Sequence, residues 1–278
     1  MTTKDAIHFG PRLIGSPTGT LRAVALVRPA ATIENARALP GEPGAVYARA
    51  FEQHEIFRKT LQYFGVETIV IEPRGEDPYE CSAADAAVAF EDGAVIMRPT
   101  SMSRRAEADR MQAEFARADV PLAGHIAPPG LLDGGDVLLA GGTAFIGVGA
   151  RGNSLGRNGF AKVAEAHGYR AVEVKLADGV TALRAVASAV AKDTIVLAPD
   201  RVDMKAFAGF NIIEVERGEE TGAGVLCLGE RHVIADVRYR TAFGAMRKAG
   251  IVVEGLDLYD FEKVGITPSL LALALKRD

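Results

Sequence analysis

Two carboxylates flank a pair of glycines in the run 131–139, which reads LLDGGDVLL. Asp133 and Asp136 are three residues apart, and a strand-like apolar run begins directly after Asp136. Glycine permits a positive φ and the close approach of another group, so this stretch could aim a carboxylate into a cavity at a strand entrance. The alternative is an ordinary turn, because aspartate and glycine are both turn-forming residues.

The composition is that of a globular protein, with 278 residues of which 48% are hydrophobic and 24% charged. The net charge is −4 and no Lys/Arg-rich run occurs, so we expect neither a nucleic-acid partner nor an anionic membrane partner. No apolar run approaches the roughly 20 residues that cross a bilayer, and residues 1–10 lack the apolar core of a signal peptide. Cys81 and Cys227 are the only cysteines and lie far apart, which excludes a disulfide framework and favours a cytoplasmic location.

A hairpin of two apolar strands recurs about every 40 to 50 residues, which is typical of a repeat architecture. The first turns at Asp92-Gly93, a strong hairpin signal, and a helical pattern follows each of the first two hairpins and the last one. The predicted hairpins span 88–99, 137–146, 186–197 and 225–234. The predicted helices span 103–118, 155–167 and 241–249, with a shorter candidate at 200–208 after the third hairpin.

The two ends of the chain supply a fifth unit of the same kind. Residues 22–28 form a predicted strand closed by Pro29, followed by a predicted helix over 47–64 and a strand over 68–71. The run 270–275 can pair with the first strand and close a ring. We therefore expect one pseudo-symmetric α/β domain over 1–278, with the first ~20 residues as an extension. Its central channel is the natural pocket, and the loops at the hairpin entrances should face it.

These motifs resemble the dimethylarginine dimethylaminohydrolases of the pentein, or amidinotransferase, superfamily over most of the chain. The resemblance implies an α/β five-bladed propeller built from pseudo-fivefold ββαβ repeats. The stretches that carry it are RAV at 22–24, EQH at 52–54, AVIMRP at 94–99, SRR at 103–105, LDGGDVL at 132–138, FIG at 145–147 and RGN at 151–153.

The family resemblance implies hydrolysis at a guanidine carbon by a cysteine nucleophile and a histidine. Here no cysteine follows Cys227, and Pro268 or Ser269 falls at the nucleophile position, with the Thr267 hydroxyl nearby. No histidine occurs in 180–183, where the family has its own. We therefore expect the usual mechanism to be absent. The candidate catalytic residues that remain are Asp133, Ser269 and His125, the last on the loop that leads to Asp133.

Substrate-binding residues are also implied by the resemblance. Arg98 and Arg151 match the positions that clamp the substrate's α-carboxylate in the relatives, and a planar guanidinium suits that task. The alternative is that Arg98 merely closes its strand and Arg151 is solvated. Asp85 and Glu80 remain from an acidic cluster in which Tyr79 and Ala84 replace two acids.

Two functions remain open from the sequence. The first, slightly favoured, is a divergent C–N hydrolase acting on a small carboxylate-bearing amino acid or an amidine or guanidine compound. The second is a non-catalytic pentein that binds small molecules or serves regulation or assembly. We expect an amino-acid-like ligand, no cofactor and no metal, because no His, Cys and acid cluster has ligand spacing. A homodimer is compatible with either.

Cys81 is a candidate site residue near the channel mouth or a buried apolar filler. His54, His167 and His232 are assigned structural roles.

Overall fold

The computed structural model describes residues 12–278, and these residues form five sheets of three strands each. In every sheet the first two strands pair antiparallel and the third pairs parallel to the second. From inner to outer strand, the sheets are β15 (Ala272–Arg277), β1 (Leu21–Val27) and β2 (Glu67–Ile71); β3 (Ala87–Ala89), β4 (Ala94–Ile96) and β5 (Leu122–His125); β6 (Val137–Ala140), β7 (Thr143–Val148) and β8 (Arg170–Lys175); β9 (Ala187–Ala191), β10 (Thr194–Leu197) and β11 (Asn211–Glu214); and β12 (Leu226–Gly229), β13 (His232–Asp236) and β14 (Val252–Leu256). The predicted pseudo-fivefold repeat is confirmed.

Helices connect the second and third strands of four sheets. They are α1 (Tyr47–Tyr63), α2 (Arg105–Arg117), α3 (Ser154–Ala166) and α5 (Arg240–Lys248). The predicted helix over 200–208 is wrong: η4 (Pro199–Arg201) and η5 (Met204–Phe207) are short 3₁₀ turns. Val202 between them is extended because it bridges Leu176 of the preceding loop, and this interrupts the helical pattern.

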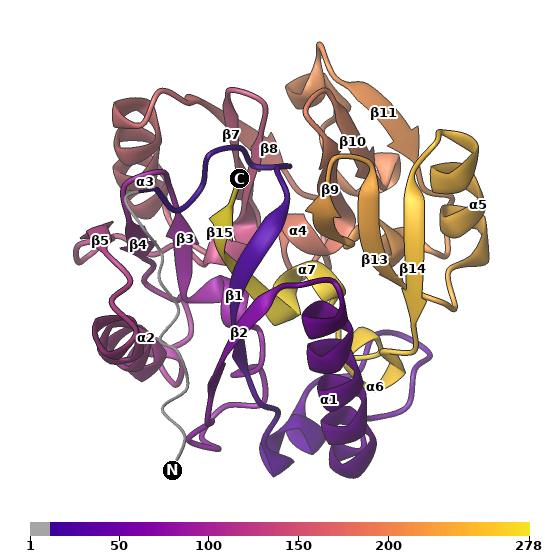
Figure 1. Cartoon of the computed structure of the whole chain (residues 1–278), viewed down its shortest axis with the longest axis horizontal. Helices are drawn as coiled ribbons and strands as arrows, with labels where there is room; N and C mark the ends of the chain where they lie inside the picture. The colour runs from indigo at the N-terminus through magenta and orange to yellow at the C-terminus, as the bar shows by residue number, and fades with distance from the viewer. Residues whose placement is uncertain (1–11) are drawn as a thin grey trace.

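The inner strands surround a common centre. Neighbouring inner strands contact one another from β15 to β3, from β6 to β9 and from β9 to β12. The inner strand β12 also contacts β1, the middle strand of its sheet, and η2 (Ala83–Asp85) contacts η3 (Gly134–Asp136). Alanine is frequent on these strands, as in 87–89, 187–191 and 272–274, and a small side chain lets them approach closely. The outer strands, such as β5 and β11, are largely exposed. The first and last described strands meet in one sheet, where β15 pairs with β1 (Figure 1).

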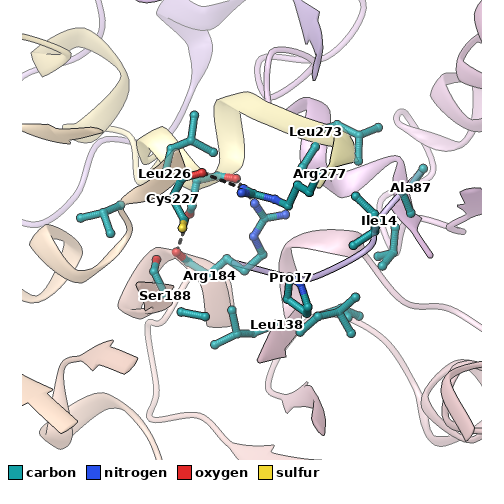
Figure 2. A pocket seen from close by; sticks show the side chains of 18 residues that line it. Ile14, Pro17, Ala87, Leu138, Arg184, Ser188, Leu226, Cys227, Leu273 and Arg277 are labelled. Atoms are coloured by element: carbon teal, nitrogen blue, oxygen red, sulfur yellow. Dashed lines mark hydrogen bonds between the residues drawn. The ribbon is translucent and has the colours of Figure 1, made fainter. Parts of the chain in front are cut away.

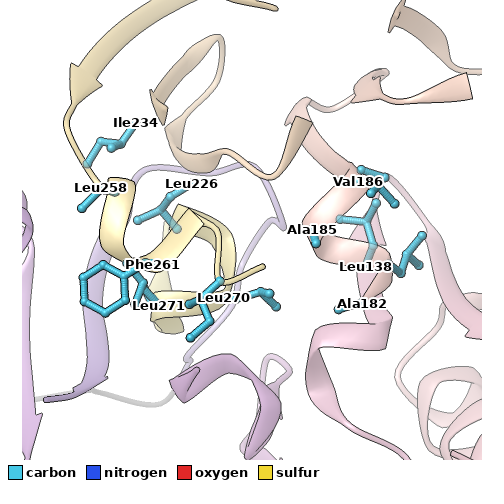
Figure 3. Close-up of a cluster of buried hydrophobic side chains, with 14 of the residues drawn as sticks. Leu138, Ala182, Ala185, Val186, Leu226, Ile234, Leu258, Phe261, Leu270 and Leu271 are labelled. Atoms are coloured by element: carbon cyan, nitrogen blue, oxygen red, sulfur yellow. The ribbon is translucent and has the colours of Figure 1, made fainter. Parts of the chain in front are cut away.

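The largest apolar core joins elements of several sheets. Figure 3 shows it gathering side chains from α4 (Leu183–Val186), α6 (Tyr259–Glu262) and α7 (Pro268–Leu271) together with β6, β12 and β13. Phe145 of β7 is fully buried, and its ring lies 4.6 Å from that of Phe207 and 5.6 Å from that of Phe210. This contact fastens the third unit to the fourth.

The expected N-terminal extension is described from residue 12 onward, and its residues 1–11, including all of the segment tested for a signal peptide, lie outside the described part. Leu13 and Ile14 are buried, and Ile14 pairs with Arg277 beside β15. The remaining short turns are η1 (Ala31–Asn35) and η6 (Glu220–Ala223). Within 12–278 no helix is long and apolar enough to cross a membrane.

Replacing Phe145 with Ala tests the packing between the third and fourth units. We expect a loss of about 3–5 kcal/mol in the free energy of unfolding, because a buried aromatic side chain leaves a cavity. Urea unfolding followed by circular dichroism measures it. Tyr63→Ala is the control, since Tyr63 is 84% exposed, and it should change the stability by less than about 0.5 kcal/mol. Equal effects of the two substitutions would contradict the packing role.

Candidate functional site

Each inner strand is preceded by a short helical turn, and these five turns meet at the centre of the molecule. They are α7, η2, η3, α4 and η6, and contacts join α7 to η2, η2 to η3, η3 to α4, and α4 to both α7 and η6. The expectation that hairpin-entrance loops converge is met here. Asp85, Asp133, Arg184 and Ser269 all lie in or beside these turns.

The paired glycines provide room for a close approach. A Cβ on Gly134 would overlap the carbonyl oxygen of Ala84, and one on Gly135 would overlap Oδ1 of Asp85 and lie 2.7 Å from Cδ2 of Leu270. Neither glycine has a positive φ, so the reason for glycine is space and not backbone conformation. The η3 turn can therefore press directly against η2 and α7.

Asp85 is the centre of a buried ion cluster. Arg151 grips it as a fork, with Nη2 donating to Oδ1 at 2.6 Å and Nη1 to Oδ2 at 3.2 Å. Arg104 donates to Oδ2 at 2.6 Å, and the backbone N–H of Gly135 donates to Oδ1 at 3.0 Å. Arg104 in turn forms a fork with Glu107, at 2.9 and 2.8 Å. Both oxygens of Asp85 are thus fully engaged by the protein itself.

The two carboxylates of the LDGGD stretch complete the cluster. Asp136 accepts from Nε of Arg151 at 3.2 Å and from the backbone N–H of Leu183 at 2.8 Å. Asp133 accepts from the N–H and the hydroxyl of Thr100, and its Oδ2 lies 3.9 Å from Nε of Arg151. The guanidinium of Arg151 therefore faces three aspartates. Its side chain is 26% exposed, so one edge of the cluster reaches solvent.

Acids outnumber arginines in this cluster, and the pKa values reflect it. Burial alone would raise the pKa of Asp85, but Arg151 and Arg104 outweigh it and hold that pKa well below its usual range. Burial raises the pKa of Asp136 to about 6, more than Arg151 lowers it. Burial likewise raises the pKa of Glu107 to about 7. Arg104 lowers this pKa only in part, because the same guanidinium also binds Asp85. Two carboxyl groups therefore titrate near neutral pH.

Arg98 and His125 form no hydrogen bond or ion pair with the side chains of this ion cluster in the described chain. Arg98 exchanges two backbone hydrogen bonds with Leu132, and its Nη1 donates to the carbonyl of Gly130 at 3.2 Å. No carboxylate among residues 12–278 pairs with its guanidinium. His125 ends β5, the exposed outermost strand of its sheet, opposite Ile96. The sequence analysis placed His125 on the loop that leads to Asp133, but the structure places it on a strand.

Ser269 is buried in α7 and is held by the backbone. Its Oγ donates to the carbonyl of Arg184 at 2.7 Å and lies 3.0 Å from the hydroxyl of Thr267. These are its hydroxyl's contacts within the described chain, and none involves an imidazole or a carboxylate. No general base therefore adjoins this serine.

The remaining nucleophile and metal candidates are accounted for by packing. Cys81 and Cys227 are free and buried, and burial raises the pKa of Cys81 to about 12, so its thiol stays neutral. His167 stacks on Phe90, and His232 pairs with Glu254. Burial lowers the pKa of His54 to about 4. Over residues 12–278 no group of three His, Cys, Asp or Glu side chains is arranged to hold a metal ion.

Three arginines at the centre, Arg104, Arg184 and Arg277, escaped the sequence interpretation, and Asp136 was singled out with Asp133 but given no partner. Arg104 and Asp136 stand inside the quoted motifs, yet their contacts with Asp85 and with Leu183 join separate elements and cannot be read from spacing. Arg184 interrupts the apolar run 182–190, and Arg277 follows the apolar run 270–275 but is still buried. A charge within a buried strand or turn was the signal that could have found them.

Comparison with known proteins identifies homologues and the fold. No family model matches the chain. It is 27% identical to a dimethylarginine dimethylaminohydrolase of Pseudomonas aeruginosa over 82% of this chain and 89% of the relative. It is 29% identical to one of Streptomyces coelicolor, over 82% and 86%. The solved Pseudomonas enzyme in complex with citrulline superposes with a TM-score of 0.82 at 23% identity, over 91% of this chain and 99% of that one.

A second solved structure extends the fold comparison beyond the hydrolases. An amidinotransferase from Microseira wollei superposes with a TM-score of 0.80 at 15% identity, covering 96% and 97% of the two chains. The chain thus has dimethylarginine dimethylaminohydrolase-like homologues and the pentein fold.

Replacing Gly135 with Ala tests the contact between η3 and η2. The added methyl would overlap Asp85 and Leu270, so we expect a loss of about 1–3 kcal/mol in the free energy of unfolding. Guanidinium chloride unfolding measures it. Gly142→Ala is a matched control in the β6–β7 turn, where an added Cβ meets nothing within 4 Å, and it should be neutral within about 1 kcal/mol. If Gly135→Ala matched this control, the close approach would not exist in solution.

Replacing Asp136 with Asn tests the raised pKa. The folded pKa of about 6 exceeds the ordinary 3.8, so the charged carboxylate is disfavoured in the fold. Its contribution to stability is full below pH 3.8 and is lost as the pH rises through 6. Asparagine does not ionise. The stability of the variant relative to the parent should therefore increase between pH 4.5 and 8, by roughly 2–3 kcal/mol.

Urea unfolding of both proteins at the two pH values gives this difference. Comparing the variant with its parent removes the opposite contribution of His54, whose lowered pKa disfavours the fold as the pH falls. A difference that does not change with pH would show that Asp136 ionises in the fold at no cost.

Proposed function

We propose that this chain is a small-molecule-binding pentein that does not hydrolyse guanidines by a cysteine–histidine mechanism. The observation that carries the proposal is the position of Arg151, whose guanidinium is bound by Asp85 and Asp136. A carboxylate site suited to a ligand guanidinium is thus filled by the protein's own side chain. The ligand that fits best is an amino-acid-like compound recognised through its carboxylate.

Displacing Arg151 by a ligand guanidinium is unfavourable. The fork between Arg151 and Asp85 is intramolecular, so a free ligand competes against a group held at high effective concentration. The bond between Arg151 and Asp85 is also charge-assisted. Asp85 is buried, and removing one partner of a buried ion pair is strongly unfavourable. Guanidine binding at Asp85 therefore needs a different position of Arg151.

The groups for covalent catalysis are also missing from the centre. Ser269 donates its proton to a backbone carbonyl and has no adjoining base, and such a serine is a weak nucleophile. The thiols of Cys81 and Cys227 have raised pKa values because they are buried, so neither is a thiolate at neutral pH. The geometry therefore favours binding over turnover.

Arg98 supports the carboxylate part of the proposal. Its guanidinium donates to one carbonyl, that of Gly130, and forms no ion pair in the described chain. Planar N–H groups without a carboxylate partner match a ligand carboxylate. Arg98 lies beside Leu132, directly before Asp133, so a bound carboxylate would border the acid cluster.

A hydrolase that works without cysteine and histidine is the second candidate, which the sequence slightly favours. The observation in its favour is the raised pKa of Asp136, about 6, because a carboxyl group that titrates near neutral pH suits proton transfer. Asp133 and Asp136 would then serve as acid and base.

A ligand screen combined with a turnover assay separates the two candidates. We expect free amino acids to raise the melting temperature and their decarboxylated counterparts to leave it unchanged, because Arg98 binds the carboxylate. Arg98→Ala should lose this shift. Arg117→Ala is the control, since Arg117 has a side chain 73% exposed and should keep it. No citrulline should form from dimethylarginine or arginine.

Two results would overturn the proposal. Multiple turnover of either substrate that disappears in both Asp133→Asn and Asp136→Asn would establish the hydrolase. A melting-temperature shift that survives in Arg98→Ala would remove Arg98 from the ligand site.

A further inference from the structure

A cavity of about 100 Å³ lies among the inner strands, distinct from the acid cluster. It is lined by residues of all five inner strands and closed on one side by Ile14 and Pro17 of the N-terminal segment (Figure 2). Most of the lining is apolar. Arg184, from α4, and Arg277, from the end of β15, enter it.

Neither arginine has a counter-ion in the described chain, although Arg277 is buried and Arg184 is partly buried. Arg277 is 7% exposed, and its Nη1 and Nη2 donate to the carbonyls of Gly19 at 2.9 Å and Cys227 at 2.7 Å. Nη2 of Arg184 donates to the carbonyl of Ser269. All of these acceptors are neutral. Within residues 12–278 no carboxylate forms a salt bridge with either guanidinium.

The contrast with the other arginines of the centre is informative. Arg104 is buried, as Arg277 is, but it is paired with Asp85 and Glu107. A buried charge without a partner is unfavourable, and two of the same sign in one cavity are more so. Burial lowers the pKa of Arg184 to about 10, the charge of Asp85 opposes this without a direct ion pair, and Arg277 lowers it further. The cavity therefore has an excess of positive charge that an anion would relieve.

Ser188 supplies a third polar group on the cavity wall. It is 4% exposed, it lines the same cavity, and its Oγ has no hydrogen-bond partner in the described chain. An unpaired buried hydroxyl is itself unfavourable. Figure 2 shows Ser188 on the wall beside Arg184, and Arg277 extending toward Arg184. A ligand that accepts hydrogen bonds from both guanidinium groups and from Ser188 would satisfy all three.

We propose that this cavity binds a small oxoanion between Arg184 and Arg277, with Ser188 as a further donor. The volume of about 100 Å³ corresponds to about three water molecules, which suits a free oxoanion and not an arginine-sized amino acid. Guanidinium groups bind carboxylate and phosphate oxygens in the same forked manner. This site goes beyond the proposed amino-acid site at Arg98 and shares no residue with it.

Titration of the full-length protein with sodium phosphate, sulfate, acetate and malonate tests this. Each is compared with sodium chloride at the same ionic strength by thermal shift and calorimetry. At least one oxoanion should give a saturable rise in melting temperature beyond chloride, with one site per chain. The phosphate and sulfate arms separate a tetrahedral anion from a carboxylate. The site is overturned if every oxoanion behaves as chloride does.

Three variants locate the effect. Arg184→Met removes one charge and should lower the affinity at least tenfold, while in chloride buffer it should melt no lower than the parent, because it removes a partly buried charge that has no carboxylate partner in the described chain. Ser188→Ala is a smaller change that preserves the fold and should weaken binding several-fold. Arg217→Met removes an exposed charge, with a side chain 82% exposed, and should bind as the parent does.

The outcome is independent of the Arg98 site. Oxoanion binding that is unchanged in both Arg184→Met and Ser188→Ala would place the anion elsewhere and overturn the inference. If Arg184→Met does not fold, Ser188→Ala decides alone. Amino-acid stabilisation lost in Arg98→Ala would persist in Ser188→Ala, so a failure of one site is distinguishable from a failure of the other.

Discussion

The carboxylate of Asp85 holds the centre of the molecule together. Its oxygens accept from Arg104 at the start of α2, from Arg151 after β7 and from the backbone of η3. Through Arg151 the same network reaches Asp136, which accepts from the first residue of α4. Three successive units are therefore joined by charge-assisted bonds where their entrance turns meet. Such bonds are stronger than neutral ones, and burial keeps them from being screened by salt.

This network divides the centre into two regions of opposite charge. On the side of the turns, acids exceed arginines, and Asp136 and Glu107 have raised pKa values. On the side of the inner strands, Arg184 and Arg277 have neutral acceptors. The same fold thus contains Arg151, which binds aspartates, and two arginines that have no carboxylate partner among residues 12–278, Arg184 and Arg277.

The sequence predicts the fold well because each unit carries local signals. Apolar hairpins with turns such as Asp92-Gly93, each followed by an amphipathic segment, indicate the repeat, and the ends of the chain supply the missing unit. The structure corrects the segment 200–208, where a long-range bridge at Val202 overrides local helical spacing. Spacing carries no information about such a bridge, since Leu176 lies in a different unit.

The site is predicted less completely, for the same reason. Sequence reasoning selects Asp85, Asp133 and Arg151, which the structure brings together, but it assigns Arg151 to a ligand carboxylate and not to Asp85. Which carboxylate Arg151 binds depends on how η2 and η3 pack. The sequence analysis interprets the glycine pair that permits this packing only as a bend. His125 was selected because its loop precedes Asp133, yet pairing with Ile96 holds it on an outer strand.

The pairing of β15 with β1 has a consequence for how the chain acquires its structure during synthesis. β1 is among the first strands to leave the ribosome, but its inner neighbour β15 is the last. Until then one side of β1 is an open edge, and the contacts of α7 with η2 and α4 are also missing. Pairing between such distant segments is slow to form. The pairing of β1 and the contacts of the central turns are therefore completed only after β15 has been synthesised.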